Sequence, residues 1–180
     1  MSSPPETGAS PSPASQTPSR ALAIVGFANS GKTELICRLL PFFGARGLKV
    51  AVLKHSHHAD PDLGERGKDT WRYRQAGARA VALAAPGLLQ VTRSFAGEPR
   101  LEEALAALAG EVDVVLVEGY KRGPLPKVAV LRPEDGGEAP PYPNLIALVS
   151  DGPVTSRLPV FQRDQVEELG RWLYDYFVQE

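Results

Sequence analysis

The chain has very little of the two side chains that most often bind transition metals. Its 180 residues include one cysteine, Cys37, and three histidines. A single cysteine excludes an internal disulfide and is typical of a reducing compartment. No apolar run is long enough to cross a bilayer, and the N-terminus lacks the basic-then-apolar pattern of a signal peptide. We therefore predict a cytoplasmic protein with no membrane partner.

The chain also lacks an excess of charge of either sign. Acidic and basic residues nearly balance, and the formal net charge is −1. Without a positive excess there is no reason to expect a polybasic membrane anchor or nonspecific nucleic-acid binding, so we predict no nucleic-acid partner. The length suits one domain with a full core, which we assign to residues 20–180.

Residues 1–19 have no large apolar side chain after Met1 and consist mostly of Ser, Pro, Ala, Thr and Gly. Such a segment buries too little surface to offset the entropy lost on ordering. We predict a disordered tail. A phosphorylated or partner-binding arm is the alternative.

From residue 20 onward, apolar runs alternate with amphipathic stretches. Strands are expected at 21–26, 48–54, 79–85, 88–92, 112–119, 127–132 and 145–150. Helices are expected at 68–77, 98–110 and 164–180, and from Lys32 into a segment where Pro41 predicts a bend or restart. This alternation predicts an α/β, three-layer fold like that of P-loop nucleotide-binding proteins, with a mostly parallel sheet and helices on both faces. The strand pair within 79–92 is expected to add an antiparallel edge.

The segment GFANSGKT (26–33) matches G-x-x-x-x-G-K-[ST] at every fixed position, after a strand and before a helix. That context is what a phosphate-binding loop (P-loop) requires, because backbone N–H groups at the positive end of a helix then surround the phosphates. A glycine turn that happens to precede a helix is the alternative. The residues expected to form the cradle are Gly26, Asn29, Ser30, Gly31, Lys32 and Thr33.

A P-loop needs an acidic group to hold the metal and its water shell. VVLVEG (114–119) places Glu118 at the end of an apolar run. We predict that Thr33 and Glu118 hold Mg²⁺, and that Lys32 and Glu118 carry any catalysis. A solvated acid at a strand end is the alternative role for Glu118.

The segment KHSHH (54–58) contains every histidine of the chain. In a parallel sheet, ligands gather at the carboxyl ends of strands, so this segment is expected beside Thr33 and Glu118. We predict that Lys54 and His55 serve the nucleotide and that the cluster holds no structural zinc. His55 and His57 point to opposite sides if the strand continues, and zinc prefers four ligands.

The residues that follow supply hard oxygen donors and further positive charge. Asp60, Asp62 and Asp69 suit Mg²⁺ or its waters, and Lys68 suits a phosphate. A solvated loop without a role is the alternative for the whole stretch.

The nucleotide base has one candidate partner. Asp151, after the apolar run 145–150, could accept hydrogen bonds from guanine, and a turn aspartate before Gly152 and Pro153 is the alternative. The N/T-K-x-D signature of many GTPases is absent.

Together these segments resemble the molybdopterin-guanine dinucleotide biosynthesis protein B (MobB) family. The matching blocks are GFANSGKT, VAVLKHSHH, GKDTWRYRQAGA, VVLVEGYK, PKVAVLR and IALVSD, in order over residues 21–151. The resemblance implies a homodimer that binds GTP and hydrolyses it weakly. It further implies a role in attaching GMP to molybdopterin during molybdenum cofactor biosynthesis, with molybdopterin and the cofactor guanylyltransferase as partners.

Three other functions use the same site. A GTP-dependent adaptor or carrier would not need hydrolysis. A small-molecule kinase would need phosphate-clamping arginines, for which Arg72 and Arg74 are candidates. A metal-delivery GTPase of related fold is supported by the histidines alone.

Overall fold

The computed structural model describes residues 20–58, 61, 63–108, 110, 112–135 and 137–179. The predicted tail, residues 1–19, lies outside the described residues, as do Asp60 and Asp62. Within the described part of the chain, no helix is long and apolar enough to cross a membrane.

Six parallel strands form the central sheet, in the order β2-β5-β1-β6-β7-β8. Their bounds are β1 (Ala21–Val25), β2 (Val50–Lys54), β5 (Val114–Glu118), β6 (Lys127–Val130), β7 (Leu145–Val149) and β8 (Val160–Phe161). Because all neighbours are parallel, every strand ends at the same edge of the sheet. The predicted α/β class is confirmed.

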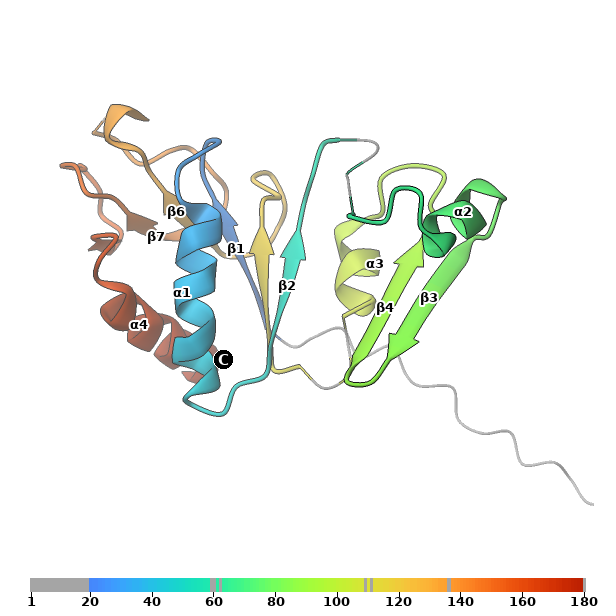
Figure 1. Ribbon diagram of the computed structural model, residues 1–180. Coiled ribbons are helices and arrows are strands. Elements are labelled where there is room, and N and C mark those ends of the chain that lie inside the picture. Colours follow the sequence, from blue (N-terminus) through green and yellow to red (C-terminus); the bar gives the residue numbers. More distant parts are fainter. Residues whose placement is uncertain are drawn as a thin grey trace, which may run out of the picture.

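Helices cover both faces of this sheet (Figure 1). Helices α1 (Lys32–Gly44) and α4 (Val166–Gln179) pack on one face, and α3 (Leu101–Ala106) packs on the other. Helix α2 (Asp69–Gln75) lies beside a hairpin at one end of the molecule, and a 3₁₀ turn (Pro133–Asp135) follows β6.

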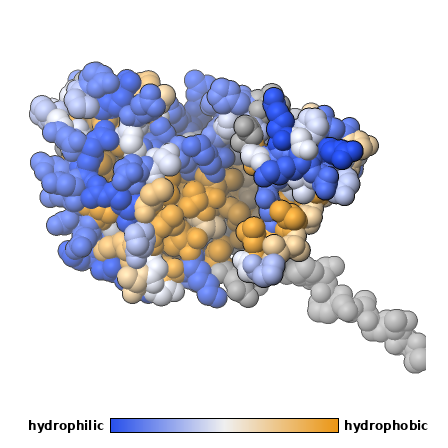
Figure 2. Space-filling model, viewed as in Figure 1, coloured by the Kyte–Doolittle hydropathy of each residue, from blue (hydrophilic) through white to orange (hydrophobic). Residues whose placement is uncertain are grey.

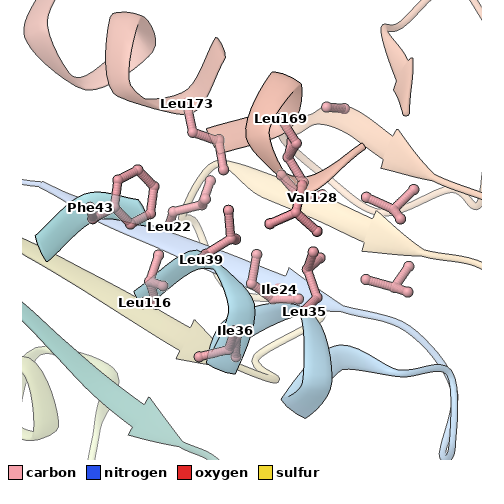
Figure 3. Packing of buried hydrophobic residues seen from close by; sticks show 14 of the residues in the cluster. Leu22, Ile24, Leu35, Ile36, Leu39, Phe43, Leu116, Val128, Leu169 and Leu173 are labelled. Atoms are coloured by element: carbon pink, nitrogen blue, oxygen red, sulfur yellow. The ribbon is translucent and has the colours of Figure 1, made fainter. Parts of the chain in front are cut away.

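Strand β1 shows why the sequence folds this way. Its side chains alternate between the two faces: Leu22 and Ile24 join the cluster under α1 and α4, whereas Ala23 and Val25 join the cluster under α3. All four are fully buried, which is typical of a central strand in a parallel sheet. In Figure 3 the leucines of α1 and α4 meet the β1 side chains in one packed layer.

One prediction about the sheet is wrong. Strands β3 (Ala80–Ala85) and β4 (Leu88–Arg93) pair with each other as a separate two-stranded sheet and do not extend the edge of the main sheet. The Pro86-Gly87 turn joins them directly, with Gly87 at φ 74°, so the two strands pair with each other rather than with the main sheet.

Other elements also differ from the prediction in their extent or presence. Helix α1 runs through Pro41 without restarting, and the carbonyl that loses its N–H partner belongs to the exposed Cys37, where water can replace it. Helix α3 is shorter than the predicted 98–110. Strand β8 was not predicted, because two residues are too few to show a pattern.

Candidate functional site

The P-loop residues connect β1 to α1 in a conformation that only glycine permits at two positions. Gly26 (φ 150°) would place an added Cβ 2.4 Å from the Val130 carbonyl oxygen. Gly31 (φ 84°) caps α1, and a Cβ there would lie 2.4 Å from the Arg163 guanidinium. Asn29 also adopts a positive φ of 58°. The loop therefore turns tightly onto the N-terminus of a 13-residue helix.

Lys32 and Thr33 begin α1 and point to neighbouring strand ends. The Lys32 ammonium donates to the Phe27 carbonyl at 2.6 Å, which folds the side chain back over the loop. The Thr33 hydroxyl donates to Glu118 Oε2 at 2.8 Å. The structure thus brings the hydroxyl and the carboxylate together, as expected of the pair proposed for Mg²⁺.

Glu118 lies between positive groups because β5 is flanked by β1 and β2. Its register partners are Ile24 on β1 and Lys54 on β2. The Lys54 ammonium lies 3.4 Å from Glu118 Oε1. Both carboxylate oxygens of Glu118 are therefore engaged, one by a hydroxyl and one by an ammonium group.

The electrostatics of this edge favour an anion. Burial lowers the pKa of Lys32 below its ordinary value; Glu118 opposes the shift, and the charges of Lys121 and Lys54 add to it. The ammonium groups of Lys54 and Lys121 thus repel that of Lys32. A bound phosphate would relieve the repulsion between them.

A cavity of about 740 Å³ opens beside the P-loop. Its volume is in the range of sites for small molecules and cofactors. It touches the P-loop only at Ala28 and Lys32, so most of its wall comes from elsewhere. The described lining residues are Ala28, Lys32, His55, Ser56, His57, His58, Glu118, Gly119, Tyr120, Lys121, Arg122 and Gly123.

His55 is fixed in the wall of this cavity. Its Nε2 lies 2.5 Å from Glu98 Oε1, and its ring lies 4.3 Å from the Tyr120 ring, centre to centre. A Cβ on Gly119 would come within 2.9 Å of His55 Cβ, so only glycine fits beside it. His55 is a structural part of the wall rather than a free imidazole.

The condition under which His55 and His57 would point to opposite sides, a strand that continues past Lys54, is not met. Strand β2 ends at Lys54, and the two rings then meet edge to face with their centres 4.5 Å apart. Alternation holds only within a strand, and the chain has already left the sheet.

Asp151 does not present a free carboxylate to a base. Its Oδ1 accepts the backbone N–H of Arg163 at 3.0 Å, and its Oδ2 lies 3.0 Å from Arg163 Nε. The same guanidinium donates to the carbonyls of Ser30 (2.8 Å) and Leu131 (2.6 Å). Arg163, which the sequence did not single out, ties Asp151 and the end of β6 to the P-loop.

The residues after the histidines lie apart from the cavity. Asp69 pairs with Arg72 at 3.6 Å on the exposed surface of α2, and neither lines the described cavity wall. Arg74 pairs with the buried Glu65 at 3.3 Å, which also binds Gln90 of the hairpin. Lys68, at the start of α2, is likewise absent from the described lining.

The donor atoms at the site suit a hard cation. The Thr33 hydroxyl and the Glu118 carboxylate offer oxygen only, which Mg²⁺ prefers and zinc does not. Across the described residues, no group of three or more His, Cys, Asp or Glu side chains is placed to hold a metal ion.

Comparison with known proteins decides the family. The sequence profile of molybdopterin guanine dinucleotide synthesis protein B matches residues 21–151. The chain belongs to this family. It is 41% identical over 128 residues to the probable molybdopterin-guanine dinucleotide biosynthesis adapter protein of Bacillus subtilis, covering 70% of this chain and 73% of that protein. The Escherichia coli adapter protein is 29% identical over 163 residues, covering 86% and 91%.

Solved structures agree with that assignment. The crystal structure of Bacillus subtilis MobB superposes with a TM-score of 0.72 at 34% identity, covering 87% of this chain and 96% of that one. A MobB homologue from Bacillus stearothermophilus gives a TM-score of 0.69 at 27% identity, covering 89% and 99%.

Sequence reasoning missed the residues on the far side of the cavity. Tyr120, Lys121 and Arg122 follow β5 and line it, and Glu98 fixes His55 from the segment before α3. A sequence signal for the first three exists, since two basic residues, Lys121 and Arg122, follow Tyr120 shortly after β5 ends at Glu118. No sequence signal marks Glu98, because its partner is 43 residues away.

Glu118→Gln tests the metal role. The amide keeps the shape of the side chain but removes the charge that would attract Mg²⁺ or its waters. We expect the Mg²⁺ concentration that half-saturates nucleotide hydrolysis to rise by about tenfold or more, with a smaller change in nucleotide affinity. Asp175→Asn, on exposed α4, is the matched control. An unaltered Mg²⁺ titration in a folded Glu118→Gln protein contradicts the assignment.

Proposed function

We propose that this protein is a Mg²⁺-dependent GTP-binding adapter in molybdopterin-guanine dinucleotide biosynthesis. It acts in the cytoplasm and assists the guanylyltransferase that couples GMP to molybdopterin, with slow GTP hydrolysis of its own. Membership of the family and the names of its relatives support the pathway. The site geometry supports the nucleotide.

One observation carries the nucleotide assignment. The P-loop glycines, the Lys32 ammonium and the Thr33–Glu118 hydrogen bond lie at a single helix N-terminus. In that arrangement Lys32 would contact the β- and γ-phosphates, and Thr33 and Glu118 would hold Mg²⁺ or its waters. Bound Mg²⁺ would neutralise phosphate charge during transfer to water.

Slow turnover follows from what surrounds the carboxylate. Glu118 is the one acid in the described cavity lining, and it is already bonded to Thr33 and Lys54. No glutamine that could orient a water lines the described wall. These facts favour a bound nucleotide that stays unhydrolysed for most of the time it spends in the site. They also support the second candidate function, an adaptor that binds GTP without hydrolysing it. Single-turnover measurements of GTP hydrolysis distinguish the two candidates.

Guanine specificity rests on the relatives, whose names describe a guanine dinucleotide pathway. Asp151 can accept hydrogen bonds from the base only if Arg163 releases its carboxylate. We propose that guanine binding, where it involves Asp151, exchanges the Arg163 contact for the N–H groups of the base.

Lys32→Ala tests the nucleotide site. Loss of the ammonium would remove a charge-assisted contact to phosphate at the start of α1. We expect GTP affinity to fall by about a hundredfold, measured by calorimetric titration with Mg²⁺ present. Lys68→Ala, which removes an equal charge away from the cavity, should bind GTP normally. Wild-type affinity in folded Lys32→Ala would remove the assignment.

We also infer a homodimer formed through the β3–β4 hairpin. A two-stranded sheet is marginally stable when it stands alone in water. Here Leu89 and Val91 are 67% and 50% exposed on one face of β4, while Gln90 on the other face bonds to Glu65. Apolar residues continue from the hairpin onto β2, whose Val52 is 39% exposed (Figure 2).

A second copy fits this surface best. Strand β2 pairs only with β5, so its outer edge presents unpaired backbone groups next to the apolar patch. In a dimer with a two-fold axis, a single contact would cover the patch on both copies, because each copy contributes the same residues. This support comes from exposure and edge geometry.

Light scattering on the purified protein measures its mass and so tests the inferred homodimer. We expect the mass of two chains for the wild type and of one chain for Leu89→Asp/Val91→Asp, because burying two carboxylates at the contact is strongly unfavourable. Val178→Asp, at an exposed site on α4, is the control and should remain dimeric. A monomeric wild type, or a double variant with the mass of two chains, contradicts the inferred interface.

A further inference from the structure

The large cavity is not the P-loop itself. Of the loop residues 26–33, the cavity touches Ala28 and Lys32 alone. Its remaining described lining comes from residues 55–58, here called the histidine segment, from Glu118 and Gly119, and from residues 120–123, here called the basic turn. A triphosphate wrapped by the loop would meet only one side of this cavity, and most of its wall faces something else.

The charges on that far wall are unused. Lys121 and Arg122 make no ion pair with a carboxylate among the described residues, and Glu118 is engaged by Thr33 and Lys54. The Lys121 ammonium instead lies 4.9 Å from the centre of the Phe27 ring. Two basic side chains, Lys121 and Arg122, thus line a space whose one described carboxylate is already engaged. Their positive charges are complementary to an anion.

The basic turn is held in place before any ligand arrives. Lys127 is fully buried, and its ammonium donates to the carbonyls of Gly123 (2.6 Å) and Leu125 (2.7 Å). The Gly123 N–H closes the turn on the Tyr120 carbonyl at 2.9 Å, and Tyr120 has a φ of 54°. Asn144 donates to the Pro124 carbonyl at 2.6 Å. The buried Lys127 ammonium therefore fixes the position of this turn through its carbonyl groups.

The opposite wall is equally fixed. The His55 ring is clamped between Glu98 and Tyr120, and it supports the ring of His57. Figure 1 shows β2 and the yellow strand beside it, β5, ending at the same edge of the sheet, so the histidine segment and the basic turn lie side by side. Preorganised donors lose little entropy when a ligand binds.

We propose that this cavity binds a second anionic ligand, a phosphate monoester, between the histidine segment and the basic turn while the P-loop holds the nucleotide. Lys121 and Arg122 contact its phosphate. The flat faces of Tyr120 and His57 suit a planar group attached to it. The proposal rests on the nucleotide site proposed above and adds to it a place for the substrate that the adapter presents.

Phenyl phosphate is the probe, titrated by calorimetry into dimeric full-length protein saturated with Mg²⁺ and a non-hydrolysable GTP analogue. With the P-loop filled, binding reports the second site. We expect Lys121→Ala/Arg122→Ala to weaken phenyl phosphate binding by about tenfold or more. The affinity of the GTP analogue should change by no more than about threefold, through the lost field alone. Arg157→Ala/Arg171→Ala removes the same charge from exposed positions elsewhere and should match the wild type.

Two results overturn the proposal. The first is phenyl phosphate binding that disappears when the GTP analogue saturates the protein, which would place the anion in the P-loop. The second is equal binding in the two double variants, with both showing wild-type melting temperatures. Failure of the nucleotide assignment is recognised separately. In that case the analogue does not bind. Phenyl phosphate binding to nucleotide-free protein is then compared between Lys121→Ala/Arg122→Ala and Lys32→Ala. If only Lys32→Ala loses phenyl phosphate binding, the second site is also rejected.

Discussion

Glu118 is the carboxylate on which the charge balance of this sheet edge depends. Its two oxygens accept the Thr33 hydroxyl and face the Lys54 ammonium, and its charge also acts on Lys32. It can occupy that place because β5 lies between β1 and β2, so that the P-loop and Lys54 reach it from opposite sides. Without the carboxylate, the lysines would repel each other across a partly buried space. With the carboxylate in place, the edge still attracts anions, and its oxygen atoms offer a position for a hard cation.

The same edge supports the proposal that the adapter hydrolyses its nucleotide only weakly. A site rich in cations and poor in catalytic acids binds phosphates well and transfers them slowly. The P-loop and the basic turn lie on two sides of Lys32 and Lys121, whose charges act on each other. An anion on one side would therefore weaken the electrostatic attraction for an anion on the other, which couples the two ligands without any movement of the chain.

Much of the fold was predictable because its determinants are local. Strand β1 is a continuous apolar run, and the P-loop follows it at a fixed spacing, so both were recognised from neighbouring residues. The order of strands at the carboxyl edge then follows from the parallel topology, which is why Glu118 and the histidine segment were expected beside Thr33. What sequence could not supply are contacts between distant residues. Arg163 occupies Asp151, Glu98 fixes His55, and the hairpin stands apart from the main sheet; each depends on partners that no local pattern specifies.

Calorimetric titration of the wild-type protein with GTP, with and without Mg²⁺ and with ATP as the competitor, tests the central claim most directly. The account predicts one GTP per chain, an affinity that rises when Mg²⁺ is added, and weaker binding of ATP. Absence of GTP binding to folded protein in the presence of Mg²⁺ would contradict it.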